Sequence, residues 1–234
     1  MKKIVVIIVL FQLMACSELQ QVVSQLPNSG GITNDQIAGG LKEALNNGIT
    51  NQVSTLAIQD GFFKNELVRI LLPEELQKVD NTLRKIGLSK IADEGLKVLN
   101  RAAEDAVGEA IPIFVDAIKG MTFTDAKNIL MGDKNAATNY LRGRTTEALY
   151  AKFNPIIKNS FTKVGADKIW SDLITKYNNL PLTQDVNPDL TDYVTGEALK
   201  GVYTMVEVEE KNIREKISSR SSDLLKRVFA LQDK

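Results

Sequence analysis

The sequence predicts an all-α protein, with a single compact domain of roughly eight to ten helices behind a flexible N-terminal tether. Apolar residues recur at helical spacing through almost the whole chain after residue 33. No run of alternating β-branched residues suggests a strand, and the six prolines fall mostly near expected helix boundaries. A chain of 234 residues can bury a sizeable core, and the absence of an internal repeat argues against a solenoid.

The first fifteen residues have the pattern of a cleaved signal peptide. Lys2 and Lys3 precede an apolar run over residues 4–11, which is much shorter than the roughly 20 residues that span a bilayer. The following Leu13-Met14-Ala15-Cys16 resembles the lipobox of bacterial lipoproteins, in which the cysteine is acylated and the peptide is cut just before it. The alternative is an ordinary signal peptide followed by an incidental cysteine.

Cys16 is the only cysteine, so it has no disulfide partner within the chain. We expect it to carry lipid, because several acyl chains on one residue give stable anchoring. Ser17, in place of the aspartate that favours inner-membrane retention in enterobacterial lipoproteins, favours the outer membrane, with the domain facing the periplasm. The membrane is therefore the first expected partner, through the lipid on Cys16.

The mature chain divides into a tether and a domain. Residues 16–32 are rich in Gln and Ser and include Pro27 and Gly30-Gly31, which is typical of a flexible linker. The helical domain is expected over residues 33–234.

The first half of the domain contains four expected helices. One begins at Thr33 or Asn34, and a loop over residues 58–72 separates it from a second that opens at Pro73. Pro112 should kink or split the apolar-periodic run over residues 89–119. Thr122 and Asp125 form a candidate capping box for a short helix that Gly132 ends. Further helical patterns cover residues 135–153, 155–178, 190–217 and 219–232.

Composition removes several classes of function. The chain has no histidine, which excludes histidine-dependent nucleophile systems and the usual zinc sites. The 29 basic and 29 acidic residues give no basic excess for binding nucleic acid. We therefore expect a non-enzymatic protein with no catalytic residue, no metal, no cofactor and no nucleic-acid partner.

Two motifs match known chemistry only in part. Ser160 and Lys163 have the S-x-x-K spacing of penicillin-interacting enzymes, but the companion motifs are missing, so Lys163 is expected to be a solvated helix residue. Residues 185–196 resemble the start of a calcium loop, but Leu190 and Gly196 stand where glycine and glutamate are needed. A loop that caps the next helix explains these residues better.

Charged residues on apolar helix stripes provide the candidate binding site. Glu209 or Glu210 falls on an apolar stripe of its helix, and Arg144 and Arg69 interrupt apolar runs elsewhere. Because an unpaired buried carboxylate is very costly, we expect Glu209 or Glu210 to meet Arg144, Arg142 or Arg69. Such a pair is either a structural ion pair or lines a cleft that recognises a polar head group.

The loop sequence Asp60-Gly61-Phe62-Phe63 places two aromatic residues after a flexible glycine. We expect the aromatic rings to anchor the loop in the core. The alternative is an exposed lip of a binding site.

Several segments together resemble one known family. They include GLKEALNNG, DGFF, RILLPEELQKV, NRAAEDAV, FVDAIKGMTFTDAKNIL, AATNYLRGRT, DYVTGEALKGVY, EEKNIRE and LLKRVF. This series resembles, over about residues 34–231, a family of bacterial envelope proteins catalogued only as a domain of unknown function (family 4197). The resemblance implies a helical, exported protein, often with a lipoprotein signal, and it carries no agreed activity. The matching positions are Asp60, Gly61, Phe62, Arg69, Pro73, Arg101, Asp116, Thr145, Asp192, Glu210 and Arg214, and we expect Arg101 to pair with Asp105 one turn on.

Three functions are compatible with these observations. The first is a lipid-anchored, non-enzymatic protein that binds an envelope partner or helps to maintain the envelope, and an exposed apolar patch would favour it. The second is a carrier of a lipid-like or other small amphipathic ligand, which a cavity of several hundred cubic ångströms with Arg69 or Arg144 at its mouth would favour. The third is a hydrolase that uses only carboxylates, and no spacing in the sequence supports it.

Overall fold

A computed structural model describes residues 32–85, 87, 89–166, 175 and 189–233. The signal peptide, Cys16 and nearly all of the tether lie outside the described residues, as do residues 185–188 of the calcium-like segment. No helix in the described part of the chain is long and apolar enough to cross a membrane.

Within these ranges the domain is all-helical, as predicted, and no residue belongs to a β-strand. Seven of the described α-helices have at least eight residues, and a short 3-10 turn, η1, and a seven-residue helix, α11, follow them. The bounds are α3 Asn34–Leu56, α4 Glu74–Lys85, α5 Ser89–Val107, α6 Ala110–Lys119, α7 Phe123–Leu130, α8 Ala136–Val164, α10 Leu190–Glu215, η1 Ile217–Ser219 and α11 Asp223–Phe229. Counted as helices of at least eight residues within the described ranges, the domain has seven, fewer than the predicted eight to ten.

Helix α8 is one helix where the sequence suggested two, over residues 135–153 and 155–178, and part of the second lies outside the described residues. Pro155 lies inside it without ending it. Phe153, Ile157 and Phe161 lie on one face at intervals of four residues and are fully buried. Burial of this stripe against neighbouring helices, α5 and α10 among them, outweighs the backbone hydrogen bond that proline cannot make. The helix ends at Gly165, whose φ of 68° is the left-handed C-cap conformation.

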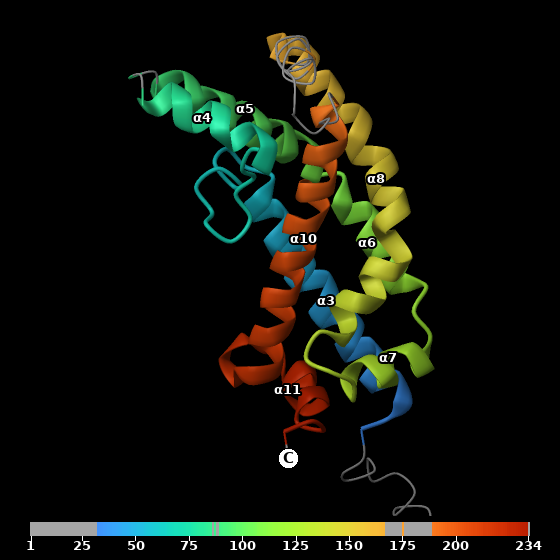
Figure 1. Cartoon of the computed structure of the whole chain (residues 1–234). Helices are drawn as coiled ribbons and strands as arrows, with labels where there is room; N and C mark the ends of the chain where they lie inside the picture. Colours follow the sequence, from blue (N-terminus) through green and yellow to red (C-terminus); the bar gives the residue numbers. More distant parts are fainter. Residues whose placement is uncertain (1–31, 86, 88, 167–174, 176–188, 234) are drawn as a thin grey trace, which may run out of the picture. The chain divides into compact units, whose positions relative to one another are not determined.

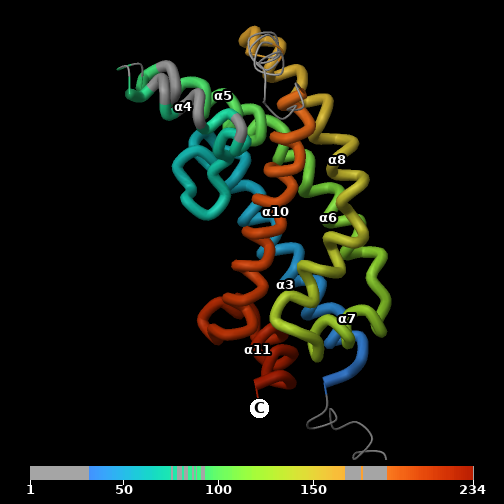
Figure 2. The backbone as a smooth tube through the Cα atoms, viewed as in Figure 1, coloured from blue at the N-terminus to red at the C-terminus, as the bar shows by residue number. Residues whose placement is uncertain are grey.

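The long helices pack lengthwise around a shared core. Helices α8 and α10 run antiparallel, and α10 also packs against α3 and α5 (Figures 1 and 2). Helix α3 contacts α6, α7 and α11, so the first and last helices of the domain pack together. Near one end of α10, helices α4 and α5 form a pair, and the loop between α3 and α4 lies beside them (Figure 1).

Local signals in the sequence placed several helix ends correctly. Thr122 and Asp125 form the predicted capping box at the start of α7, in which each side chain accepts from the other's backbone N–H. The run over residues 89–119 divides into α5 and α6 just before Pro112. Residues 57–73 form the predicted connecting loop.

The loop packs on α10 through a close approach at Gly201. A Cβ atom built on Gly201 would lie 2.7 Å from the ring of Phe62 and 3.3 Å from Val68. The Phe62 ring is fully buried and has no room to move away. Glycine at position 201 therefore lets the loop lie directly against the helix.

We predict that Gly201→Ala lowers the free energy of unfolding by about 1–3 kcal/mol, because the added methyl group overpacks the contact with Phe62. The matched control is Gly196→Ala in the same helix, where a Cβ would meet nothing within 4 Å. That control should be neutral or stabilising by up to about 1 kcal/mol, since alanine favours the helix. Urea unfolding of both variants measures the difference, and equal stabilities would contradict the packing.

Candidate functional site

The loop between α3 and α4 is held on α5 by one buried carboxylate. Glu104 of α5 is 4% exposed, and its oxygens accept hydrogen bonds from the backbone N–H groups of Asp60, Phe62 and Phe63 at 3.0–3.2 Å. Arg101, one turn earlier, also donates to Glu104. Charge-assisted bonds of this kind are the strong ones, and together they replace the water lost on burial. We call Glu104, Arg101 and these three amides the Glu104 cluster.

Asp60 joins the same cluster through its side chain and through its backbone. Its carboxylate pairs with Arg101 and with Lys64, the latter at 2.7 Å. Its φ of 69° is in the left-handed region, which Asp tolerates better than most residues. Gly61 follows because a Cβ there would lie 2.5 Å from the carbonyl oxygens of Thr55 and Leu56. The loop thus turns sharply and places Phe62 in the core, as predicted, whereas Phe63 is only half-buried, with Arg69 over its ring.

Further along the loop, a turn over residues 65–69 leads into residues 69–73, which belong to no helix or strand. The side-chain amide of Asn100 accepts from the Ile70 N–H at 2.8 Å and donates to the Ile70 carbonyl at 2.9 Å. Both bonds lie on one edge of the segment, as they would beside a neighbouring strand. Asn100 itself is fully buried, so it satisfies this edge within the protein.

Exposure alternates along the same segment with a period of two. Val68, Ile70 and Leu72 are buried, at 7%, 1% and 6% exposed. Leu67 and Leu71 are 65% and 53% exposed, and Arg69 between them is also exposed. Residues 67–72 therefore have one apolar face in the core and a second face, of two leucines and an arginine, turned to solvent.

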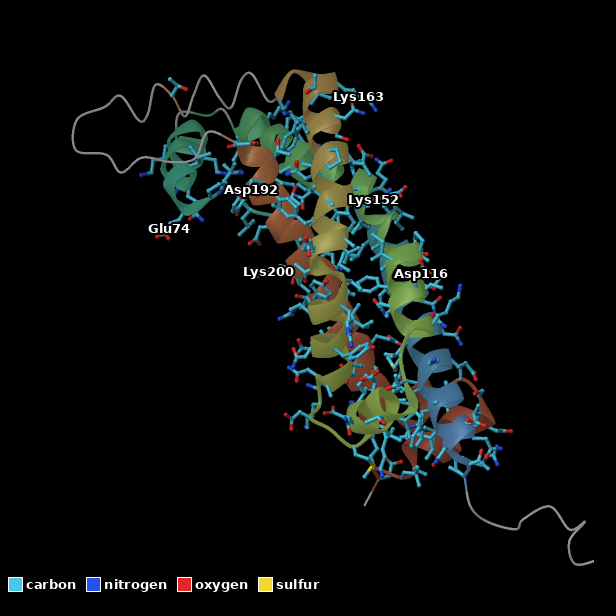
Figure 3. All side chains as sticks on the ribbon, turned by 90° about the vertical axis from the view of Figure 1, so that its right-hand side faces the viewer. Glu74, Asp116, Lys152, Lys163, Asp192 and Lys200 are labelled. Carbon is cyan, nitrogen blue, oxygen red and sulfur yellow. The ribbon has the colours of Figure 1, made fainter. Side chains whose placement is uncertain are left out.

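A groove of about 550 Å³ runs between this segment and helix α10. One wall comes from residues 67–77, and the other from Tyr193, Glu197, Lys200, Gly201 and Thr204, which share one face of α10. We call it the α10 groove. In Figure 3, the labelled Glu74 and Lys200 lie on the same side of the domain, while Asp116 and Lys152 lie on the other. The Tyr193 hydroxyl donates to the Leu71 carbonyl at 2.9 Å and ties the two walls together.

Charges of both signs line the α10 groove. Lys200 lies 3.4 Å from Glu197 on its own helix, so these two partly neutralise each other. The Arg69 guanidinium lies over the Phe63 ring at 4.6 Å, and it makes no ion pair with a described residue. Arg69 is thus a positioned positive charge beside two exposed leucines.

A second buried carboxylate, Glu210, holds the other end of α10. Its oxygens accept from the backbone N–H groups of Ala137 and Thr138 at the start of α8, each at 2.9 Å. Arg214, one turn on in α10, donates to Glu210 and to the carbonyls of Ile129 and Leu130 at the end of α7. Glu210 and Arg214 are 6% and 8% exposed. This arrangement joins α7, α8 and α10 and leaves no free charge for a ligand.

The predicted partners of this glutamate were wrong. Glu210 is the buried residue of the two, but it pairs with Arg214 and not with Arg69, Arg142 or Arg144. Glu209 is half-buried and accepts from Gln52 at 2.9 Å. All three arginines are exposed: they lie on the loop or on the outer face of α8, where they stack on Phe63, Tyr203 and Tyr140, respectively.

Arg144 belongs to a second groove, of about 470 Å³, between α6 and α8. We call it the α6–α8 groove. Asp116 also lines it, together with Asp125 and Tyr140. The predicted apolar stripe through Arg144 does not exist, because the buried face of α8 instead passes through Leu141, Thr145 and Leu149.

Comparison with known proteins agrees with the motif order. The sequence model of the family described as "Protein of unknown function (DUF4197)" matches residues 31–230. The chain belongs to this family. No curated protein and no solved structure matches this chain.

The family positions of this DUF4197 domain fall into two groups. Those in the first group hold elements together: Asp60, Gly61, Phe62 and Arg101 in and around the Glu104 cluster, Thr145 of α8, which bonds Tyr203 of α10, and Glu210 and Arg214 of α10. Those in the second group line grooves or the surface: Arg69 and Pro73 in the α10 groove, Asp116 in the α6–α8 groove, and Asp192, which accepts from the Tyr150 hydroxyl at 2.5 Å.

Other expectations about single residues have mixed outcomes. Arg101 pairs with Asp60 and Glu104, so its predicted pairing with Asp105 was wrong; Asp105 accepts from Ser160 at 2.7 Å instead. Lys163 is exposed, as predicted. Asp189 caps α10 by accepting from the Thr191 N–H, which is the capping role expected of the calcium-like loop.

The residues that build the groove were not predicted as a group. Glu104, Asn100, Tyr193, Glu197 and Lys200 were not singled out from the sequence. One available signal was the position of Asn100 and Glu104 among Leu99, Ala103 and Ala106, since a polar side chain on a buried helix face needs a partner.

The lining of the α10 groove defines the contacts that it can offer. Its side chains offer apolar contact, ion pairing and hydrogen bonds, and its backbone offers further donors and acceptors. Within the described residues, no cluster of three acidic or cysteine side chains could hold a metal ion.

We predict that protonation of the Asp60 carboxylate lowers the free energy of unfolding in acid. Hydrogen bonds from Lys64 and then from Arg101 hold the pKa of the Asp60 carboxyl below its ordinary value of 3.8. A lowered pKa in the folded state stabilises the fold above pH 3.8, and this stabilisation disappears as the pH falls through the folded-state pKa. Asp60→Asn keeps a residue that tolerates positive φ. The Asp60→Asn variant should have a lower free energy of unfolding than the wild type at pH 6, and the difference between the two proteins should be smaller at pH 3.

Urea midpoints at the two pH values measure this gap. Lys64→Met removes the largest contribution to the lowered pKa. Its stability difference from the wild type should therefore also shrink between pH 6 and pH 3, but by less than that of Asp60→Asn. A gap that stays constant between pH 6 and pH 3 would contradict the role given to Asp60.

Proposed function

We propose that this protein is a non-enzymatic, lipid-anchored binding protein of the bacterial cell envelope. In this proposal, lipid on Cys16 holds the chain in the outer membrane, and the helical domain faces the periplasm. The α10 groove is its binding surface.

The observation that carries the proposal is the fixed wall of the α10 groove. Leu67 and Leu71 remain more than half exposed although Asn100 holds Ile70 beside Leu71 and Glu104 holds the loop just before Leu67, at Phe62 and Phe63. Exposed apolar side chains on a rigid, hydrogen-bonded segment beside a charged rim are typical of a recognition surface. Arg69 between them adds directional charge.

The anchor rests on sequence alone. A short apolar run followed by Leu13-Met14-Ala15-Cys16, with no other cysteine, is the pattern of an acylated N-terminus. A polar tether after it separates the lipid from the domain, so the groove can meet partners beyond the membrane surface.

A carrier of a lipid-like or other small amphipathic ligand is the second candidate. The α6–α8 groove supports it, because it offers about 470 Å³ with Arg144 in its lining. The α10 groove also has the expected size and an arginine. Both grooves, however, are lined by charged residues as well as apolar ones, whereas a carrier's pocket is mostly apolar.

We predict that a photo-reactive residue in the α10 groove captures a specific partner in cells. Replacing Leu71 with p-benzoylphenylalanine in the full-length protein should give a discrete adduct on irradiation, because position 71 is exposed inside the groove. The matched control replaces Lys152, an exposed residue of α8 on the other side of the domain (Figure 3). Mass spectrometry of the adducts gives the identity of what is bound.

The anchor is tested in the same cells. The wild type should sediment with outer membranes and carry acyl mass on Cys16, and Cys16→Ser should lose both. An unprocessed or unanchored wild type contradicts the lipoprotein assignment, and the same adducts at positions 71 and 152, or none at either, contradict the groove as a binding surface.

A further inference from the structure

We infer that the occupant of the α10 groove is an extended peptide segment of a partner protein, which adds as a strand along residues 70–72 and offers a carboxylate to the Arg69 side chain. This inference rests on the proposed function, since it names the class of partner for the same groove. It comes from the backbone of the loop and from its charge.

The segment has one satisfied edge and one partly open edge, on which the Arg69 N–H is already bonded to the Asn65 carbonyl at 2.8 Å. On the α5 side, the Asn100 amide bonds both the N–H and the carbonyl of Ile70. In an extended chain, the N–H and carbonyl of the next residue point to the opposite edge. The Tyr193 hydroxyl on α10 reaches the Leu71 carbonyl, which places this second edge toward the groove.

On the groove edge, backbone groups remain available. The Leu71 N–H has no hydrogen-bond partner among the described residues, and its carbonyl, bonded once to Tyr193, can accept a second bond. An unpaired strand edge is a ready template for another extended chain. Peptide recognition by strand addition uses such an edge for affinity and uses side-chain contacts for specificity.

The shape of the groove favours a single peptide over a second copy of this domain. The open edge lies between the loop and the face of α10 that carries Tyr193, Glu197 and Lys200. A strand lies about 4.8 Å from its neighbour, so a thin extended chain can enter beside the loop. In a second copy, the same edge is bonded to that copy's own α10 through Tyr193, so the copy would have to bring this helix to the groove as well.

Charge and apolar contact then restrict the peptide sequence. Residues directly opposite each other in paired strands point to the same face. The peptide residue opposite Leu71 should therefore be apolar, and the residue opposite Arg69, two positions away, should be Asp or Glu. Arg69 favours such a carboxylate because it has no acidic partner of its own among the described residues.

The test is a selection of random seven-residue peptides, displayed on phage, on the full-length protein in detergent micelles. Enriched peptides should alternate apolar and polar residues and carry Asp or Glu two positions from an apolar residue. The enriched consensus is then synthesised with a fluorescent label, and its binding is measured by anisotropy.

Two variants separate backbone pairing from side-chain contact. Leu71→Pro removes the N–H at the open edge, whereas Leu71→Val keeps it and shortens the side chain to a similar degree. The consensus peptide should bind Leu71→Pro about tenfold more weakly than Leu71→Val, because a lost donor leaves a peptide carbonyl unpaired. Circular dichroism establishes that both variants are folded.

Arg69→Glu keeps every backbone group and gives a test that does not depend on proline. It should weaken the acidic peptide and strengthen a version in which Lys replaces the acid. Failure to enrich any peptide, or equal binding to Leu71→Pro and Leu71→Val together with indifference to Arg69→Glu, overturns strand addition.

These failures remain distinct from failure of the proposed function. A position-71 adduct in cells with the mass of a phospholipid would overturn the peptide while leaving the groove as a binding surface. Absence of any groove-specific adduct would remove both.

Discussion

The candidate site depends on the hydrogen bonds that the buried carboxylate of Glu104 accepts. Three backbone amides and Arg101 converge on it, and together they fix the loop between α3 and α4 against α5. An isolated buried charge would be very costly, so the loop and the glutamate each need the other. Because the loop is fixed there, Phe62 fits against Gly201 and the following segment lies along α10 as one wall of the groove.

The same solution recurs at the far end of α10. Glu210 accepts from two backbone amides at the start of α8 and from Arg214, just as Glu104 accepts from loop amides and from Arg101. In both places a glutamate with an arginine three or four residues away satisfies backbone groups that no regular helix bond can reach. Arg101 and Arg214 thus stabilise the framework at the two ends of α10. Arg69, Arg142 and Arg144 are instead exposed on the surface.

Sequence reasoning succeeded where the deciding interaction is local. The Thr122–Asp125 capping box lies within four residues, and the helical character of α10 follows from its apolar spacing. It failed for Glu104, whose partners are backbone amides about 40 residues earlier that leave no mark on side-chain patterns. The apolar stripe correctly indicated that Glu210 is buried, but the expected partners were wrong, because the partner is Arg214 on the same helix. The alternating burial over residues 67–72 was hidden because leucines occupy the exposed positions, so alternation in burial is not alternation in polarity.

Residue-resolved amide hydrogen exchange tests the central claim most directly, namely that the loop is held on one edge and open on the other. NMR of the full-length protein in micelles should show slow exchange for the amides of Phe62 and Ile70, which are bonded to Glu104 and Asn100. The Leu71 amide, on the edge that faces the groove, should exchange much faster than the amides of Phe62 and Ile70, because protection follows hydrogen bonding and burial. Comparable protection of Ile70 and Leu71, or fast exchange of Phe62 and Ile70 in an otherwise protected domain, would contradict the account of the groove.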